Sequence, residues 1–297
     1  MTMPDLPLPP ALWAAVHGLA ESTAGVWLLL TILGAVFTAV SLVARPCNPG
    51  QPWWRKPDVL TDVCYWFAIP VVSGYARVWL LVIGIVVMNA ACASAGLPAQ
   101  FGEGKGPLAG LPFWAQVPLY LILSDLVMYA THRLFHTMRL WRFHAVHHSS
   151  EQVEWVSAAR FHPVDAVFHG ALSDAVPLLL GISPDVVIAL VPFSVALAAL
   201  AHANLDWTFG PLRYLLVSPV FHRWHHTGPD QGGNMNFAAS FPFIDLIFGT
   251  FYMPKGVLPE AYGNGDPSFP SGFGGQLVHP FVGAGAGGAA EGAGLGR

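Results

Sequence analysis

The chain has 297 residues, of which 54% are hydrophobic and only 10% are charged, and its formal net charge is −4. Soluble domains carry about 25% charged residues, so this composition excludes an ordinary soluble domain and favours a bundle of membrane spans. The chain contains no basic run, so no nucleic-acid partner is expected. Cys47, Cys64 and Cys92 form no CxxC pair, which argues against a disulfide framework or a thiolate metal site.

The first long apolar stretch predicts a membrane span at residues 23–43. No lysine or arginine precedes Arg45, so the basic start of a cleaved signal peptide is missing and we expect the span to be retained. The Pro- and Gly-rich residues 45–50 then end the helix. Residues 1–59 are therefore interpreted as an N-terminal segment with the first transmembrane helix.

The second apolar region, residues 63–95, is longer than the roughly 20 residues that one span needs. Pro70, Gly74 and Arg77 interrupt it. Because proline and glycine weaken helices, we expect a short interfacial or re-entrant piece followed by a span that starts near residue 78.

Four further segments follow in chain order. Residues 96–112 are rich in Gly and Pro and predict a loop, and residues 113–130 predict another span. Residues 132–163 are polar, aromatic and rich in histidine, so we expect them outside the hydrocarbon. Residues 164–203 are apolar but broken at 181–184, which fits either a helical hairpin or one span followed by a surface helix.

Basic residues predict the orientation of these spans. They gather at 45–56 and 132–163, whereas the loop at 96–112 carries only Lys105. By the positive-inside rule the histidine-rich segments face the cytoplasm. The sequence thus predicts an all-α integral membrane protein, with about four transmembrane helices in a bundle and a cytoplasmic histidine-rich helical cap. We expect a multi-pass protein of the inner (plasma) membrane.

Eight histidines form three tight clusters beside these apolar segments. The clusters are His132-x-x-x-His136, His144-x-x-His147-His148 and His222-x-x-His225-His226. On a helix, positions i, i+3 and i+4 share one face, so each cluster is expected to aim its imidazoles the same way. Histidine is the commonest metal ligand, and ionisable groups near lipid usually mark function. The clusters therefore predict a metal site.

The spacing of the histidines narrows the kind of metal site. Zinc hydrolases usually show HExxH, and carboxylate di-iron bundles show Glu-x-x-His; neither motif occurs. Haem needs one or two axial histidines rather than eight. An all-nitrogen, dinuclear site remains, because two metals with four or five ligands each need about eight to ten donors.

Three polar residues between the second and third clusters are further candidates. His202 ends an apolar segment and is favoured as a ninth ligand. Asp206 lies four residues later, on the same helical face, and it or Asn204 could complete or orient the ligand set.

Four more residues carry open interpretations. His162 could be a ligand, an outer hydrogen-bond donor or a loop anchor. Asp125 and Asp165 could accept N–H bonds from ligand histidines, or they could cap helices. His169 falls in an apolar run and is interpreted as a satisfied core histidine.

The order HxxxH, HxxHH, a single histidine region and HxxHH resembles the fatty acid hydroxylase/sterol desaturase superfamily of integral membrane di-iron oxygenases. Flanking segments share the resemblance: Leu140-Trp141-Arg142-Phe143-His144, Ala159-Arg160-Phe161-His162-Pro163, Asn236-Phe237 and residues 245–252. The resemblance covers residues 60–255, which are interpreted as the catalytic domain. Residues 256–297 are a Gly- and Pro-rich tail that is predicted to be disordered.

The resemblance implies O₂-dependent hydroxylation of a C–H bond in a lipid, such as a fatty acyl chain, a sterol or a related lipid. Two non-haem iron ions would be the cofactors, with no catalytic residue beyond the metal ligands. The implied ligands are His132, His136, His144, His147, His148, His202, His222, His225 and His226. Some members have a second histidine where this chain has Asp206, which leaves the ligand count open. The chain has no haem-binding domain or iron–sulfur cysteine pattern, so a separate electron-transfer protein or reductant is expected.

Three alternatives stay open. A lipid desaturase or an ether-lipid monooxygenase would use the same metal core. A metal-binding membrane transporter or sensor belongs to another class and predicts ionisable residues along the spans. The segments at 24–44 and 113–130 are nearly bare of such residues, with Asp125 as the exception, and this favours an enzyme.

Overall fold

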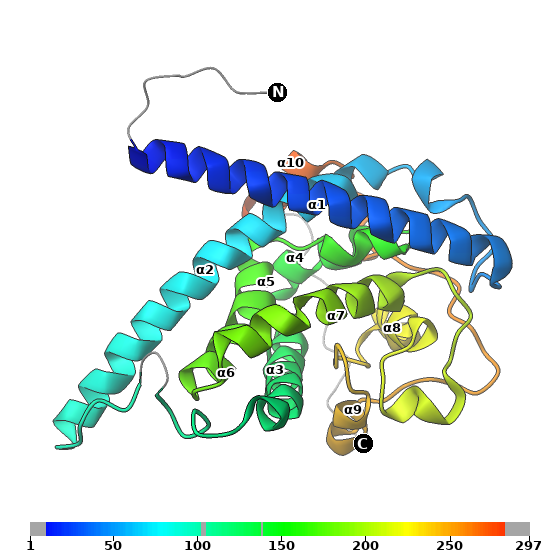
Figure 1. The fold of residues 1–297 in the computed structure, drawn as a ribbon. Coiled ribbons are helices and arrows are strands. Elements are labelled where there is room, and N and C mark those ends of the chain that lie inside the picture. Colours follow the sequence, from blue (N-terminus) through cyan, green and yellow to red (C-terminus); the bar gives the residue numbers. More distant parts are fainter. Residues whose placement is uncertain (1–9, 102–104, 138, 283–297) are drawn as a thin grey trace. The chain divides into compact units, whose positions relative to one another are not determined.

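The computed structural model describes residues 10–101, 105–137 and 139–282, and within these ranges the long elements are all helices (Figure 1). Among the described residues, four helices are long and apolar enough to cross a membrane. They are residues Ala24–Val43 within α1 (Pro10–Val43), α2 (Val59–Ser94), α3 (Phe113–Phe135) and α7 (Pro184–His202). The expectation of an all-α membrane protein with about four membrane helices is confirmed. Helix α1 belongs to a unit of its own, residues 1–44, and the rest of the chain forms a second unit.

Helix α2 runs unbroken for 36 residues, so the predicted interruption at Pro70 is wrong. At 1.5 Å per residue α2 is about 54 Å long, well beyond the roughly 30 Å of a hydrocarbon core. Its first turns bury Asp62, Tyr65 and Trp66 against the segment that carries η3 (Trp155–Ala159). These tertiary contacts involve residues before Pro70, whereas the apolar span of the helix follows Pro70. One continuous helix therefore serves as both a span and a support for the cap.

The apolar region after residue 163 folds as a helical hairpin. The first arm is α5 (Pro163–Ala166), the π-helical turn η4 (Val167–Ala171) and α6 (Leu172–Leu179), and the second arm is α7. Both arms pack on α3, and Figure 1 shows α6 and α7 joined by a short turn. Gly181 lies in that turn with φ +96°, and a Cβ there would meet the Ala109 nitrogen at 2.8 Å. The end of α7 therefore lies on the same side of the helices as the start of α5.

The histidine-rich cap is formed by residues 139–162 and 203–271, which connect the ends of α3, α5 and α7. Only short helices occur there: α4 (Trp141–His144), η2 (His147–Ser149), η3, η5 (Gly210–Tyr214), α8 (Pro219–His225), η6 (Pro229–Gly233) and α9 (Phe243–Phe248). A further 3₁₀ turn, η1 (Trp53–Arg55), precedes α2.

The tail predicted to be disordered contains α10 (Phe273–Val282), so that expectation is wrong for these residues. Gln276 is 1% exposed, its side-chain oxygen accepts from the Tyr65 hydroxyl at 3.2 Å, and its Nε2 donates to Ser149 Oγ at 3.1 Å. Composition alone could not show this burial, because the partners are more than 120 residues away. Residues 283–297 lie outside the described part of the chain.

Candidate metal centre

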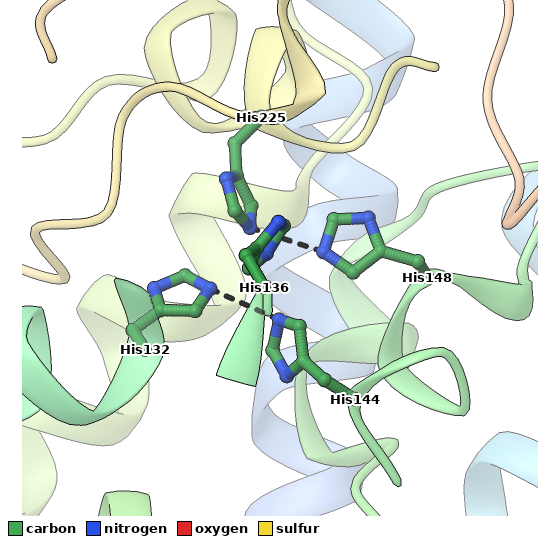
Figure 2. A group of neighbouring side chains, drawn as sticks. All are labelled: His132, His136, His144, His148 and His225. Atoms are coloured by element: carbon green, nitrogen blue, oxygen red, sulfur yellow. Dashed lines mark hydrogen bonds between the residues drawn. The ribbon is translucent and has the colours of Figure 1, made fainter. Parts of the chain in front are cut away.

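All nine histidines predicted as metal ligands come together in two neighbouring groups. The first group comprises His132, His136, His144, His148 and His225, shown in Figure 2, and the second comprises His147, His202, His222 and His226. Within each group, one ring nitrogen from each residue lies within 4.8 Å of all the others. The fold thus offers five nitrogen donors at one position and four at the other.

Each HxxHH motif divides its imidazoles between the two groups. In the second motif His144 and His148 enter the first group while His147 enters the second, and in the third motif the assignment is reversed. This is possible because the groups adjoin: the ring centres of His148 and His226 are 4.6 Å apart. The expectation that all imidazoles of one motif point the same way is therefore wrong for both HxxHH motifs.

Several of these histidines are positioned by the ends of helices. His132 lies in the last turn of α3 and His202 is the last residue of α7, so two membrane helices end at the histidines. The third motif lies on α8, whose N-terminus is set by Ser218 and Pro219. The Ser218 hydroxyl caps the helix by accepting from Phe221 N at 3.2 Å. Pro219, at the first helical position, has no backbone N–H that would need an acceptor.

Protein oxygens accept the Nδ1–H of six of the ligands. The pairs are His132 with Phe237 O (2.8 Å), His225 with Met235 O (2.8 Å), His202 with Ala198 O (2.8 Å), His147 with Arg160 O (3.1 Å), His136 with Asn234 Oδ1 (3.2 Å) and His144 with Asp165 Oδ2 (2.8 Å). A carbonyl oxygen can only accept, so Nδ1 carries the proton and Nε2 keeps its lone pair. Backbone carbonyls have no sequence signature, and reasoning from the sequence did not find them.

The unprotonated Nε2 atoms then face one another at short range. Those of His132 and His144 are 3.0 Å apart, a contact drawn in Figure 2, and those of His147 and His202 are 3.4 Å apart. Two lone pairs at this separation repel unless a cation lies between them. In addition, Nε2 of His136 is buried without a hydrogen-bond partner. The residues therefore fit two bound metal ions.

Burial keeps these imidazoles neutral. Loss of hydration lowers the pKa of His136 to about 4 and lowers the pKa of His144 and of His226 well below the ordinary value, with neighbouring histidines adding to the effect in the last two. Neutral imidazole is the form that binds a metal.

The two candidate outer acids have different roles. Asp165 accepts from His144, as one of the two interpretations predicted. Asp125 does not touch a ligand; its carboxylate accepts from the backbone of Ala239 at 2.8 Å and of Phe241 at 2.7 Å, and so anchors the loop after the third motif to α3.

The other undecided residues lie outside both groups. His162 caps α5, since its Nδ1 accepts from Val164 N at 3.1 Å, while its Nε2 donates to Leu277 O at 3.2 Å. Asn204 is paired with the backbone of Asn48 in both directions at 2.9 Å. Asp206 belongs to neither group. Its backbone N–H donates to Arg45 O.

His169 was interpreted as a satisfied core histidine, and this is wrong in one respect. The ring is buried, but its Nε2 has no hydrogen-bond partner. Together with His144 and Asp165 it forms a third cluster of potential ligand atoms. The i, i+4 spacing from Asp165 was the only signal in the sequence.

A buried ion-pair network, not foreseen from the sequence, supports the segment that orients His147. The Arg160 guanidinium lies 2.5 Å from Asp62 Oδ1, and Lys56 Nζ lies 2.7 Å from Asp62 Oδ2. All three side chains are almost fully buried. Because Arg160 O accepts from His147, α2 holds this ligand in place through Asp62.

A family model described as fatty acid hydroxylase matches residues 117–250, which contain all nine histidines. The chain is 34% identical to an ornithine lipid hydroxylase of Rhizobium tropici over 171 residues, 57% of this chain and 51% of the relative. It is 30% identical to an alkylglycerol monooxygenase of Xenopus tropicalis over 132 residues, 44% of this chain and 29% of the relative. It is also 30% identical to a very-long-chain aldehyde decarbonylase of Oryza sativa subsp. japonica over 162 residues, 48% and 25% of the respective lengths.

No solved structure matches the chain. The chain spans about half, or less, of the length of these curated relatives. The match nevertheless includes the whole histidine centre together with most of α3, which leads into it, and all of α7, which ends at it. Over residues 117–250, the chain is therefore similar to the fatty acid hydroxylase family.

Proposed function

We propose that this chain is a membrane-bound, non-haem di-iron oxygenase that hydroxylates a C–H bond of a lipid. The observation that carries the proposal is the convergence of nine histidines into groups of five and four. The family match and the similarity to a lipid hydroxylase support the reaction class. The overall reaction is RH + O₂ + 2e⁻ + 2H⁺ giving ROH and H₂O.

In this proposal the five histidines of the first group hold one iron and the four of the second group hold the other. When bound, the irons supply the activation of O₂ that side-chain acids and bases cannot supply. The protein orients six of the nine imidazoles through their Nδ1 bonds and keeps the imidazoles neutral by burial. Trp141 packs on His136, and Phe161 stacks on His147 at 4.3 Å between ring centres, so apolar rings exclude water there.

A lipid suits the position of the centre. Because α3 and α7 end at His132 and His202, the histidines lie where apolar spans meet the polar cap. An amphiphile at that boundary keeps its head group near water while a chain carbon approaches the irons. We place the centre on the cytoplasmic side of the inner (plasma) membrane, since basic residues gather at 45–56 and 132–163. Electrons come from a separate protein or reductant.

The test combines metal analysis with isotope labelling. Purified full-length protein should hold about two irons per chain. Cells that express it under ¹⁸O₂ should accumulate a lipid carrying one ¹⁸O atom, found by comparing lipid extracts with and without the protein. An unsaturated product without ¹⁸O would favour a desaturase instead. A single exchangeable metal and no lipid product would favour a transporter or sensor.

Oxidation of an ether lipid is a second candidate, supported by the similarity to an alkylglycerol monooxygenase. Supplying the same preparation with an alkylglycerol and with an amino-acid-linked lipid separates the two substrates. Consumption of the alkylglycerol alone would favour the ether-lipid candidate over hydroxylation of another lipid.

A further inference from the structure

The carboxylate of Asp165 is fully buried and is shared by two histidines. His144 Nδ1 donates to Oδ2 at 2.8 Å, and His169 Nδ1 lies against Oδ1. His169 Nδ1 is also 3.1 Å from the Asp165 carbonyl oxygen. All the oxygens around His169 Nδ1 are acceptors, so Nδ1 carries the proton and Nε2 keeps a lone pair, as in the predicted ligands.

The local backbone brings His169 to this position. Asp165 and His169 are four residues apart, which places them on one helical face, and the π-helical turn η4 includes His169. Such turns insert one extra residue into a helix and often accompany functional sites. The Ser173 hydroxyl donates to the carbonyl of His169 and covers this turn.

The ring of His169 adjoins two members of the first histidine group. Its ring lies within 14° of parallel to that of His144, with the ring centres 5.4 Å apart, and edge-on to His132 at 5.3 Å. His144 Nε2, on the ring parallel to that of His169, lies 3.0 Å from His132 Nε2. His169 Nε2 is buried and has no hydrogen-bond partner. A buried nitrogen lone pair without a partner, on a ring that adjoins two predicted ligands, has the chemistry of a metal donor.

We propose that His169 is a tenth imidazole donor of the metal centre, and that Asp165 is the positioning residue that holds His144 and His169 toward the first metal. The inference rests on the proposed function in requiring a metal in the first group. Neither residue belongs to the histidine motifs, and the role of His169 follows only from the shared carboxylate.

The test replaces only the free nitrogen. In His169→Asn the side-chain amide nitrogen takes the place of Nδ1 and keeps the bond to Asp165, while nothing replaces Nε2. The full-length wild type and variant are loaded with ferrous iron without oxygen, and iron release to a chelator is followed. We expect roughly tenfold faster release from one of the two sites, and a larger effect in Asp165→Asn, which disturbs two histidines. The unfolding temperature of the metal-free protein should not change in His169→Asn.

His162→Asn is the matched control, because it makes the same substitution at another buried histidine outside both groups and preserves an acceptor for Val164 N. Its iron release should equal that of the wild type. The inference is overturned if His169→Asn releases iron at the wild-type rate, or if both variants release it equally fast. If the wild type binds iron and oxidises a lipid but His169→Asn retains iron normally, this inference is wrong and the proposed function still stands. A wild-type chain that binds no iron would remove the proposed function as well.

Discussion

At the scale of residues, the centre depends on fixed tautomers. Six Nδ1 atoms donate to protein oxygens, and the corresponding Nε2 atoms converge in two groups. A free imidazole would exchange between tautomers, so each of these bonds selects the form that can coordinate. The second group has only four donors, which makes each of its members harder to replace.

His147→Ala should therefore lower the iron content of the protein and abolish lipid oxidation, because three donors would remain in the second group. The protein should still insert in the membrane, since the change removes no apolar contact between spans. Metal analysis and product detection on the purified variant provide the measurement. His279→Ala is the control, since His279 lies outside both groups. Lipid oxidation at the wild-type rate in His147→Ala would show that the ligand assignment is wrong.

A second prediction at this scale concerns Glu154, which precedes η3. Burial raises the pKa of Glu154 from 4.5 to about 7, although Arg223, Lys56 and Asn204 oppose the shift. A carboxyl group with a raised pKa in the folded state destabilises the fold when it ionises. This cost is absent below the unfolded pKa, develops as pH rises from 4.5 towards 7, and is complete above that.

Glu154→Gln removes that ionisation while keeping the shape of the side chain. The unfolding temperature of the variant should exceed that of the wild type at about pH 8, and the two should differ little at about pH 5. Thermal unfolding in detergent at both pH values measures the difference. An equal shift at both pH values would mean that ionisation of Glu154 does not control stability.

At the scale of elements, α2 links the membrane region to the metal centre. Its apolar part is exposed, as expected for a helix facing lipid, but its first turns bury Asp62 between Lys56 and Arg160. Arg160 in turn supplies the carbonyl that orients His147. A residue in the first turns of a membrane helix thereby positions a ligand more than 80 residues later in the chain.

Asp62→Asn should destabilise the protein by about 3–5 kcal/mol, because it leaves two buried cations with only the partly exposed Asp58 as a shared carboxylate. Asp58→Asn should cost less, since the Asp58 side chain is 16% exposed and Asp62 would still neutralise both cations. Denaturation of both variants in detergent compares these losses. Similar losses would indicate that burial of Asp62 is not what makes it important.

At the scale of the whole molecule, the chain separates apolar helices from a polar cap that contains the histidines. Helices α3 and α7 each end at a ligand, and the hairpin of α5–α7 connects Asp165, beside His144, to His202. The turn at Gly181 and the loop that contains Lys105 lie at the other end of these helices, since a Cβ on Gly181 would meet Lys105 O at 3.0 Å. In the proposed topology the metal centre and this loop therefore lie on opposite sides of the membrane.

Cysteine labelling tests that orientation. In a background with Cys47, Cys64 and Cys92 replaced by alanine, an impermeant thiol reagent added to intact cells should label Lys105→Cys and not Asp266→Cys. Both positions are exposed, so accessibility of the side chain does not limit either reaction. Permeabilised cells, in which both positions should react, are the control. Labelling of Asp266→Cys alone in intact cells would place the cap outside the cytoplasm.

The sequence by itself determined the features that depend on local pattern. Long apolar stretches identified four membrane helices. The spacing of eight histidines, together with the position of His202 at the end of an apolar segment, identified the members of the two groups, because hydropathy and i, i+4 periodicity are properties of neighbouring residues. The same local rules failed at Pro70 and in the tail. There, distant partners of α2 and Gln276 outweigh helix propensity and composition.

Only the tertiary structure decided how the donors are shared. The division into five and four, the carbonyls of Phe237, Met235 and Arg160, and the carboxylate shared by His144 and His169 all join segments that are far apart in sequence or lack a side-chain signal. Metal binding depends on the direction of each lone pair, and that direction is set by contacts that exist only after the helices have packed.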